Sequence, residues 1–147
     1  MYTRILVATD GSDLSQKAAT KAIDLAAAFK AELVVLQVVP PYPISYFEGG
    51  IAMDSAEIQR IETLWADKAK AHVDAIAQTA LAQGVKTQAV TSRSDVVSNA
   101  ILAVAKQHRC DLIVMASHGR RGITRLLLGS ETQQVLTHTA QAVLVVR

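Results

Sequence analysis

The chain has 147 residues, half of them hydrophobic, and a formal net charge of +2. This length suits one domain with a single core, and the apolar content excludes a disordered chain. The net charge is too small to imply a polyanionic partner, because electrostatic nucleic-acid binding needs a strongly basic face. We therefore expect one domain over residues 1–147 that binds no nucleic acid.

The cysteine and the apolar runs bear on the compartment of the protein. Cys110 is the single cysteine, so it cannot form an internal disulfide, and its place before an apolar run is typical of a buried, inert thiol. The N-terminal run ILVA is too short for a signal peptide, and no stretch reaches the roughly 18 apolar residues of a membrane helix. These features predict a soluble protein of the reducing cytoplasm with no membrane partner.

The first half of the chain predicts two strands with a helix between them. Residues 4–9 and 32–39 are short apolar runs, and Pro40 and Pro41 end the second one because proline cannot continue a ladder. The turn Asp10-Gly11-Ser12 leads into a helix over residues 12–30. Its apolar residues recur at helical spacing: Leu14, Ala18, Ala22, Ala26 and Phe29.

Residues 40–54 hold three prolines, three aromatic residues and Gly49-Gly50, which predicts a long loop. A loop of this length inside a compact domain is either a functional lid or poorly ordered, and the sequence favours neither.

The second half predicts two further strand–helix pairs and a closing strand. A long helix over residues 55–83 ends at Gly84 and is followed by a strand at 85–90. The apolar stripe of this helix is Ile58, Ile61, Trp65, Ala69, Val73, Ile76 and Ala80. Asp95 is the expected cap of a third helix, whose stripe is Val97, Ile101, Val104 and His108. A strand at 111–117, a helix capped by Ser130 with Gln133 completing a capping box, and a strand at 142–146 complete the chain.

Strands that alternate with helices predict parallel strands joined by right-handed crossovers. The fold class is therefore α/β, a doubly wound parallel sheet with helices on both faces. Ligands of such sheets bind beyond the carboxyl ends of the strands, where two neighbouring loops diverge. The loop after the first strand, TDGSD, matches neither a Walker A loop nor G-x-G-x-x-G.

The segment after the fourth strand, ASHGRRGITRLLLGSET at residues 116–132, is the strongest candidate site. Its glycines allow backbone N–H groups to approach an oxyanion, and it leads into a helix N-terminus, where unpaired donors meet the positive end of the dipole. Ser130 adds a hydroxyl donor, whereas the Glu131 carboxylate would repel phosphate unless it turns to solvent. The alternative is that Gly119 and Gly122 only permit turns, and that Arg120, Arg121 and Arg125 form a solvated surface.

These residues resemble those of the universal stress protein family along the whole chain. The resemblance rests on ILVATDGSDLS, ELVVLQVV, DLIVMASHGRRGITRLLLGS and the terminal AVLVVR. Nucleotide-binding members of that family carry G-x-x-G, nine residues, then G-[S/T]. Here Ala116 and Gly119 stand at the first two glycine positions, and Gly129-Ser130 follow after nine residues.

The resemblance implies a five-stranded sheet of order 3-2-1-4-5, as in adenine nucleotide alpha hydrolase-like folds. It implies ATP, ADP or AMP as the ligand, with Mg²⁺ or Mn²⁺ accompanying the phosphates. It also implies that the base and ribose contact Thr9, Asp10 and Val38. The ribose and phosphates would contact Ala116, Ser117, His118, Gly119, Arg120, Arg121, Gly122, Gly129, Ser130, Glu131 and Thr132. Members tend to form homodimers by antiparallel pairing of the last strand, here residues 142–146, which would be a sticky edge if uncovered.

Two departures from the family pattern affect these expectations. Ala116 replaces a glycine, so its methyl group weakens binding if the backbone there needs a positive φ or if the ligand contacts that position. It is tolerated if the conformation is ordinary. SRSD at residues 92–95 stands where many relatives carry Gly-x-Pro, which changes the shape of that loop more than its chemistry.

Other chemistries fit the sequence less well. Ser117 beside His118 is a poor hydrolase pair, because consecutive residues rarely give the geometry and no G-x-S-x-G elbow is present. The four histidines lack metal-ligand spacing, and His72 and His108 are interpreted as helix-flank residues, so no protein-held metal and no catalytic residue are expected. A nucleotide-binding regulatory module, a ligand-free dimeric interaction protein and a slow ATPase remain as alternatives.

Overall fold

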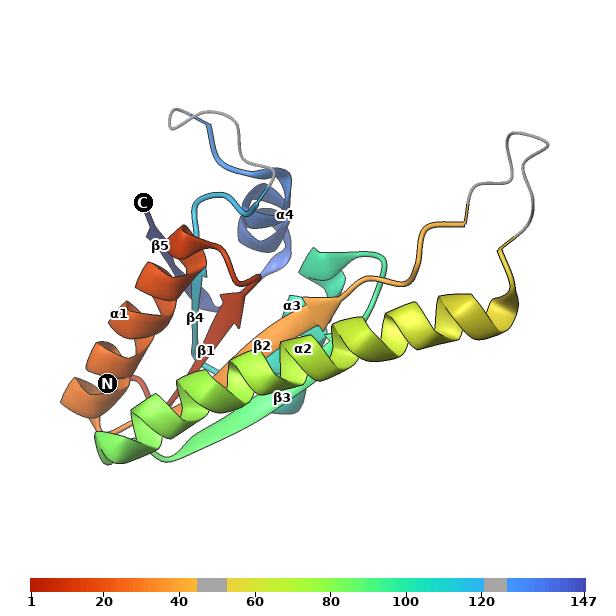
Figure 1. Cartoon of the computed structure of the whole chain (residues 1–147). Coiled ribbons are helices and arrows are strands. Elements are labelled where there is room, and N and C mark those ends of the chain that lie inside the picture. The colour runs from red at the N-terminus through yellow and green to blue at the C-terminus, as the bar shows by residue number, and fades with distance from the viewer. Residues whose placement is uncertain (45–52, 121–126) are drawn as a thin grey trace.

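The computed structural model describes residues 1–44, 53–120 and 127–147, and it confirms the predicted sheet (Figure 1). Five parallel strands lie in the order β3-β2-β1-β4-β5. The elements, in chain order, are β1 (Arg4–Thr9), α1 (Asp13–Phe29), β2 (Glu32–Val39), α2 (Ser55–Ala82), β3 (Thr87–Arg93), α3 (Val97–Gln107), β4 (Leu112–Ala116), α4 (Ser130–His138) and β5 (Ala142–Val146).

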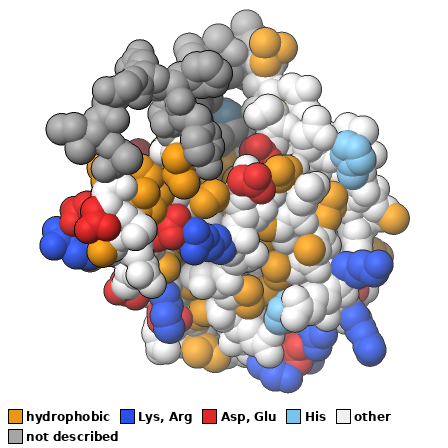
Figure 2. Space-filling model, turned by 90° about the vertical axis from the view of Figure 1, so that its right-hand side faces the viewer, with side chains coloured by type: hydrophobic (Ala, Val, Ile, Leu, Met, Phe, Trp, Pro, Cys, Tyr) orange, Lys and Arg blue, Asp and Glu red, His pale blue; other side chains and the backbone are white. Residues whose placement is uncertain are grey.

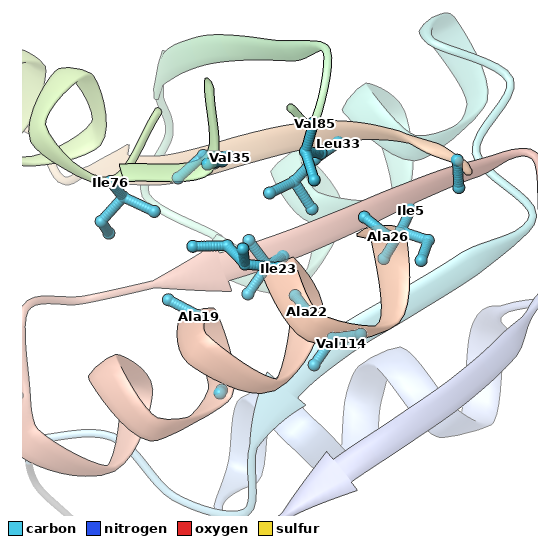
Figure 3. Close-up of a cluster of buried hydrophobic side chains, with 14 of the residues drawn as sticks. Ile5, Ala19, Ala22, Ile23, Ala26, Leu33, Val35, Ile76, Val85 and Val114 are labelled. Atoms are coloured by element: carbon cyan, nitrogen blue, oxygen red, sulfur yellow. The ribbon is translucent and has the colours of Figure 1, made fainter. Parts of the chain in front are cut away.

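Two hydrophobic layers hold helices on the two faces of the sheet. Successive side chains of a strand point to opposite faces, so Ile5 and Val7 of β1 join the layer with α1 and α2, whereas Leu6 joins the layer with α3 and α4. Alanines such as Ala22 and Ala26 let α1 pack close to the strands (Figure 3). The predicted doubly wound architecture is therefore confirmed, and the carboxyl ends of all five strands share one end of the molecule.

Three helices end in the same backbone motif, which requires a residue in the left-handed conformation. At the end of α2, Gly84 N–H donates to Leu81 O and Val85 N–H donates to Ala80 O, with Gly84 at φ +78°. This is the Schellman arrangement, so the predicted stop at Gly84 is confirmed. At the ends of α1 and α3 the left-handed residues are Lys30 and Arg109, each with φ +54°.

The strand after α2 begins later than the predicted boundary. Val85 closes the turn after α2, because its amide donates to Ala80 O and its side chain is buried, and Lys86 O then accepts from the Leu33 amide of β2. The β3 ladder then runs over Thr87–Arg93 instead of residues 85–90.

The apolar stripe of α2 is buried only in the second half of the helix. Its buried residues all lie in the second half: Ala69, Val73, Ile76, Ala77 and Ala80. The first half extends past the sheet (Figure 1), so Trp65 stays 37% exposed and stacks on Tyr42, with ring centroids 5.9 Å apart. The loop predicted at 40–54 connects β2 to α2, and its residues 45–52 lie outside the described part of the chain.

Charged groups at the amino ends of the strands pair with one another. Glu32 accepts hydrogen bonds from Arg4 and Lys86, which joins β1, β2 and the turn before β3. Asp111 accepts from the backbone amides of Thr3 and Arg4, so the start of β4 is tied to the start of β1. These contacts fix the end of the sheet opposite the candidate site.

The described surface shows no strong segregation of charge on the face seen in Figure 2. Hydrophobic, acidic and basic side chains are interspersed there among neutral polar ones. Among helices in the described ranges, none has the length and apolar character needed to cross a membrane.

Substitution Gly84→Ala should lower the free energy of unfolding by about 1 kcal/mol, because an L-residue at positive φ is strained. An added Cβ would meet no atom within 4 Å, so the effect comes from the backbone alone. Urea denaturation would measure it, with Gln83→Ala as the control, since Gln83 has φ −95°. Equal effects of the two substitutions would contradict the left-handed assignment.

Cys110 should react slowly with thiol reagents in the folded protein. Burial raises the pKa of its thiol to about 11, and the side chain is almost fully buried. Because the thiolate is the reactive form, alkylation by iodoacetamide near pH 8 should be at least about 100-fold slower than in urea. Comparable rates in both conditions would show that this buried environment is wrong.

Candidate functional site

The site lies where the strand order reverses. β1 has β2 on one side and β4 on the other. After β1 the chain passes to α1 on one face, and after β4 it passes to α4 on the other. The loops beyond these two strands therefore diverge, as they do at the ligand crevices of open α/β sheets. The candidate residues Asp10, Gly119 and Ser130 all belong to these two connections.

The carboxylate of Asp10 bridges the two loops. Its Oδ1 accepts from the Ser12 amide at 2.9 Å, and its Oδ2 accepts from the Arg120 amide at 2.9 Å. A Cβ built on Gly119 would lie 2.5 Å from Oδ2. Gly119 is therefore needed because the carboxylate approaches its backbone closely, and its φ is not in the left-handed region.

Asp10 is ionised at neutral pH. Partial burial raises the pKa of its carboxyl group, but hydrogen bonds from Ser12 and Arg120 outweigh this effect and bring the pKa below its ordinary value. An ionised carboxylate only accepts hydrogen bonds. Chemically, it suits a ligand hydroxyl or N–H group and disfavours a phosphate oxygen.

The two ends of the candidate loop are held together by backbone contacts. The Gly129 amide donates to Ser117 O at 2.7 Å, and the Thr132 hydroxyl donates to Ala116 O at 2.9 Å. A Cβ on Gly129 would lie 3.2 Å from the Cα of His118. Gly129 thus permits close packing of the chain, and its own N–H is already used inside the protein.

The N-terminus of α4 has no side-chain cap among the described residues, which corrects the predicted capping box. Gly129, with φ −60°, is the N-cap, and Ser130 is the first helical residue and is exposed. The Gln133 amide side chain donates to Leu128 O and does not reach back to the cap. The first-turn amides of a helix lack intrahelical partners, so this end of α4 can accept an anion.

The Glu131 carboxylate is turned towards α3 rather than fully to solvent. Its carboxylate accepts from the Ser98 amide at 2.8 Å, in the first turn of α3. The predicted cap Asp95 is wrong: Val96 is the N-cap and offers no side-chain acceptor. Glu131 supplies that acceptor from α4, and its negative charge suits the positive end of the α3 dipole.

Ala116 has an ordinary strand conformation. It pairs with Val146 in the β4–β5 ladder, and it is not among the residues with positive φ. Alanine at this position therefore causes no backbone strain, and only a contact between its methyl group and a ligand could weaken binding. The methyl group is buried with the rest of β4.

Ser117 and His118 are closer than expected for consecutive residues. Ser117 Oγ lies 3.1 Å from His118 Nδ1, within hydrogen-bond distance. Ser117 is 6% exposed, and no described residue hydrogen-bonds the other ring nitrogen of His118. The Ser117 hydroxyl is therefore poorly accessible, and residues 1–44, 53–120 and 127–147 supply no third group to orient the imidazole as in a nucleophilic triad.

The remaining predicted contacts lie at the same end of the sheet. Thr9 is buried, with its hydroxyl 3.0 Å from that of Ser15, and it pairs with Gln37 in the β1–β2 register. Val38 is the next residue of β2 and is half-buried. Arg121, Gly122 and Arg125 lie outside the described residues.

The sequence did not indicate that Arg120 and His72 of α2 both lie close to Gly11. The Arg120 guanidinium lies over Gly11, and the ring of His72, which was expected only to flank its helix, approaches the same glycine. His72 is hydrogen-bonded to Gln37 of β2, with Nδ1 2.7 Å from Oε1. The only sequence signal was that His72 precedes a residue of the apolar stripe, Val73.

Comparisons with known proteins agree with this arrangement. The model of the universal stress protein family matches residues 1–147. A universal stress protein of Methanocaldococcus jannaschii is 35% identical over 147 residues, which cover all of this chain and 83% of the relative.

Two solved structures are similar over nearly their whole length. The universal stress protein UspA of Lactobacillus plantarum has a TM-score of 0.84 and 29% identity, covering 99% of this chain and 98% of that one. A universal stress protein in complex with cAMP has a TM-score of 0.71 and 25% identity, covering 99% and 97%. The sequence motifs, the strand order and these matches together show that the chain belongs to the universal stress protein family.

Proposed function

We propose that this protein is a regulatory module that binds an adenine nucleotide between β1 and β4. The observation that carries the proposal is the juxtaposition of an ionised acceptor, Asp10, with the uncapped N-terminus of α4 across the switch point. One group suits the hydroxyls of a nucleoside and the other suits its phosphates. The similar structure in complex with cAMP supports an adenine nucleotide as the ligand class.

In this proposal the described residues contact different parts of the nucleotide or shape the loop that holds it. Asp10 would accept from ribose or base, with Thr9 and Val38 beside it at the strand ends. The Ser130 hydroxyl and the first-turn amides of α4 would hold the phosphates. Gly119, Gly129 and Thr132 would shape the loop, and Glu131 would position α4 against α3.

A divalent cation would arrive with the nucleotide under this proposal. Within the described ranges, no group of three or more His, Cys, Asp or Glu side chains is placed to hold a metal ion. The phosphates themselves would supply most of its ligands.

A second candidate function is a dimeric interaction protein that binds no nucleotide. The loop contacts favour it, because Asp10 and the Gly129 amide already have partners inside the protein. In either case we propose a homodimer through β5, which has only β4 as a neighbour in the described sheet and leaves Leu144 38% exposed.

Substitution Ser130→Asp should weaken AMP and ATP binding about tenfold or more, because a carboxylate at the start of α4 competes with and repels the phosphates. The same charge suits the helix dipole, so stability should not fall. Isothermal titration calorimetry would measure the affinities, and mass spectrometry of the denatured protein would identify any co-purified nucleotide.

Ser55→Asp is the matched control, since Ser55 is the exposed first residue of α2. It should leave both affinities unchanged. Equal loss in the two variants would place the phosphates elsewhere, and absence of binding by the unsubstituted protein would favour the interaction protein. Glycine-to-valine variants at 119 and 129 are poor tests, because they would break internal contacts whichever function is correct.

Substitution Leu144→Glu should shift the protein from dimer to monomer in light scattering coupled to size-exclusion chromatography. Antiparallel β5 pairing about a twofold axis places like charges near one another, which is unfavourable. Leu136→Glu on α4 is the control, because Leu136 is 40% exposed. A dimer that survives only the Leu144 substitution would rule out the β5 interface.

A further inference from the structure

Arg120 and His72 pack on the same point of the backbone. A Cβ built on Gly11 would lie 2.7 Å from Nη2 of Arg120 and 3.8 Å from Cε1 of His72. Gly11 also has φ +81°. The absence of a side chain at Gly11 is therefore what admits the guanidinium, which we call the Arg120–Gly11 contact. It brings a permanent positive charge beside a titratable imidazole.

The His72 ring is fixed from the other side by Gln37. Nδ1 lies 2.7 Å from Gln37 Oε1, and an Nδ1–H donor can form this bond in both the neutral and the protonated imidazole. The sheet holds Gln37 in place, because Gln37 belongs to β2. Arg120 comes from a loop, so its side chain is the partner near His72 that can move.

The charged groups that face His72 come from two loops. Among the described residues they are Arg120 after β4 and Asp10 after β1, while α1 contributes the uncharged Gln16, Thr20 and Ile23 to the groove beside the ring. Burial lowers the pKa of His72, the Arg120 charge lowers it further, and the Asp10 charge opposes both. The Arg120–Gly11 contact therefore favours the neutral form of the His72 imidazole over the protonated form.

Arg120 is held at its backbone rather than by an ion pair of its guanidinium. Its amide donates to Asp10 Oδ2, and the five ion pairs found among residues 1–44, 53–120 and 127–147 do not include its side chain. Release of the guanidinium therefore breaks no ion pair in this part of the chain. A nucleotide phosphate at the same loop would offer it a bidentate partner.

We propose that the Arg120 side chain leaves the Arg120–Gly11 contact for the phosphates of a bound nucleotide, so that nucleotide binding and protonation of His72 favour each other. This inference rests on the nucleotide-binding function proposed above. When the guanidinium leaves, the protonated imidazole loses a repelling neighbour, so the pKa of His72 rises. By linkage, nucleotide affinity increases as pH falls through the titration range of His72.

The ligand-free half of the proposal is tested without nucleotide. In ¹³C-histidine-labelled protein, with the His72 signal assigned through His72→Gln, the substitution Arg120→Met should raise the pKa of His72. Arg120→Gln should act in the same direction, which guards against poor folding of one variant. Lys106→Met is the control, because it removes the same charge from α3 on the opposite face of the sheet. An unchanged His72 in both Arg120 variants would overturn the proposal.

The coupled half is tested with AMP. Saturating AMP should raise the pKa of His72 in the unsubstituted protein. The ratio of Kd values at about pH 8 and about pH 5.5 should exceed that of His72→Gln by up to about tenfold, which corresponds to one unit of pKa change. Titration of the AMP phosphate is common to both proteins and cancels in this comparison.

The outcomes separate this proposal from the proposed function. AMP binding with no change at His72 would overturn the coupling and leave nucleotide binding intact. Absence of AMP and ATP binding at both pH values would overturn the proposed function together with the coupling. In that case the Arg120→Met comparison would still decide whether the guanidinium lies beside His72 in the ligand-free protein.

Discussion

The Asp10 carboxylate joins two loops that are 110 residues apart in sequence. Each of its oxygens accepts from a backbone amide, one at the start of α1 and one after β4. The spacing of these loops is therefore fixed by the protein itself, before any ligand arrives. The close approach at Gly119, the position of Arg120 and the charge beside His72 all depend on this bridge.

The sheet could be predicted because its signals are local. Short apolar runs alternate with helical periodicity along the chain, and chirality leaves few ways to connect parallel strands. The end of α2 could be predicted from local sequence as well, since a glycine at the right position is enough for a Schellman motif. The cap of α3 could not, because the carboxylate that accepts from its Ser98 amide belongs to Glu131, 33 residues further along the chain. The exposure of the first half of α2 could not be predicted for a related reason: periodicity gives the face of a helix that is apolar, but not how far the sheet extends beneath it.

The sequence predicted where the candidate site lies but not which residues contact one another within it. Glycine spacing located the loop, and the switch-point rule located Asp10. The spacing did not show what each glycine approaches. Gly119 accommodates Asp10 and Gly129 accommodates His118, so both are explained by contacts inside the protein. His72 carried no motif at all, because its environment is created by Gly11, Gln37 and Arg120, which only the fold brings together.

The strand backbone at Ala116 also affects how such sites are recognised. The first position of the glycine pattern lies within the β4–β5 ladder and has no positive φ, so the fold itself accepts a methyl group there. At Gly119 and Gly129, in contrast, a Cβ would lie 2.5 Å from Asp10 Oδ2 and 3.2 Å from the Cα of His118, so a neighbour would have to move. A search pattern that admits alanine at the first position and insists on glycine at the other two would match the packing of this loop better than one that weights all three equally.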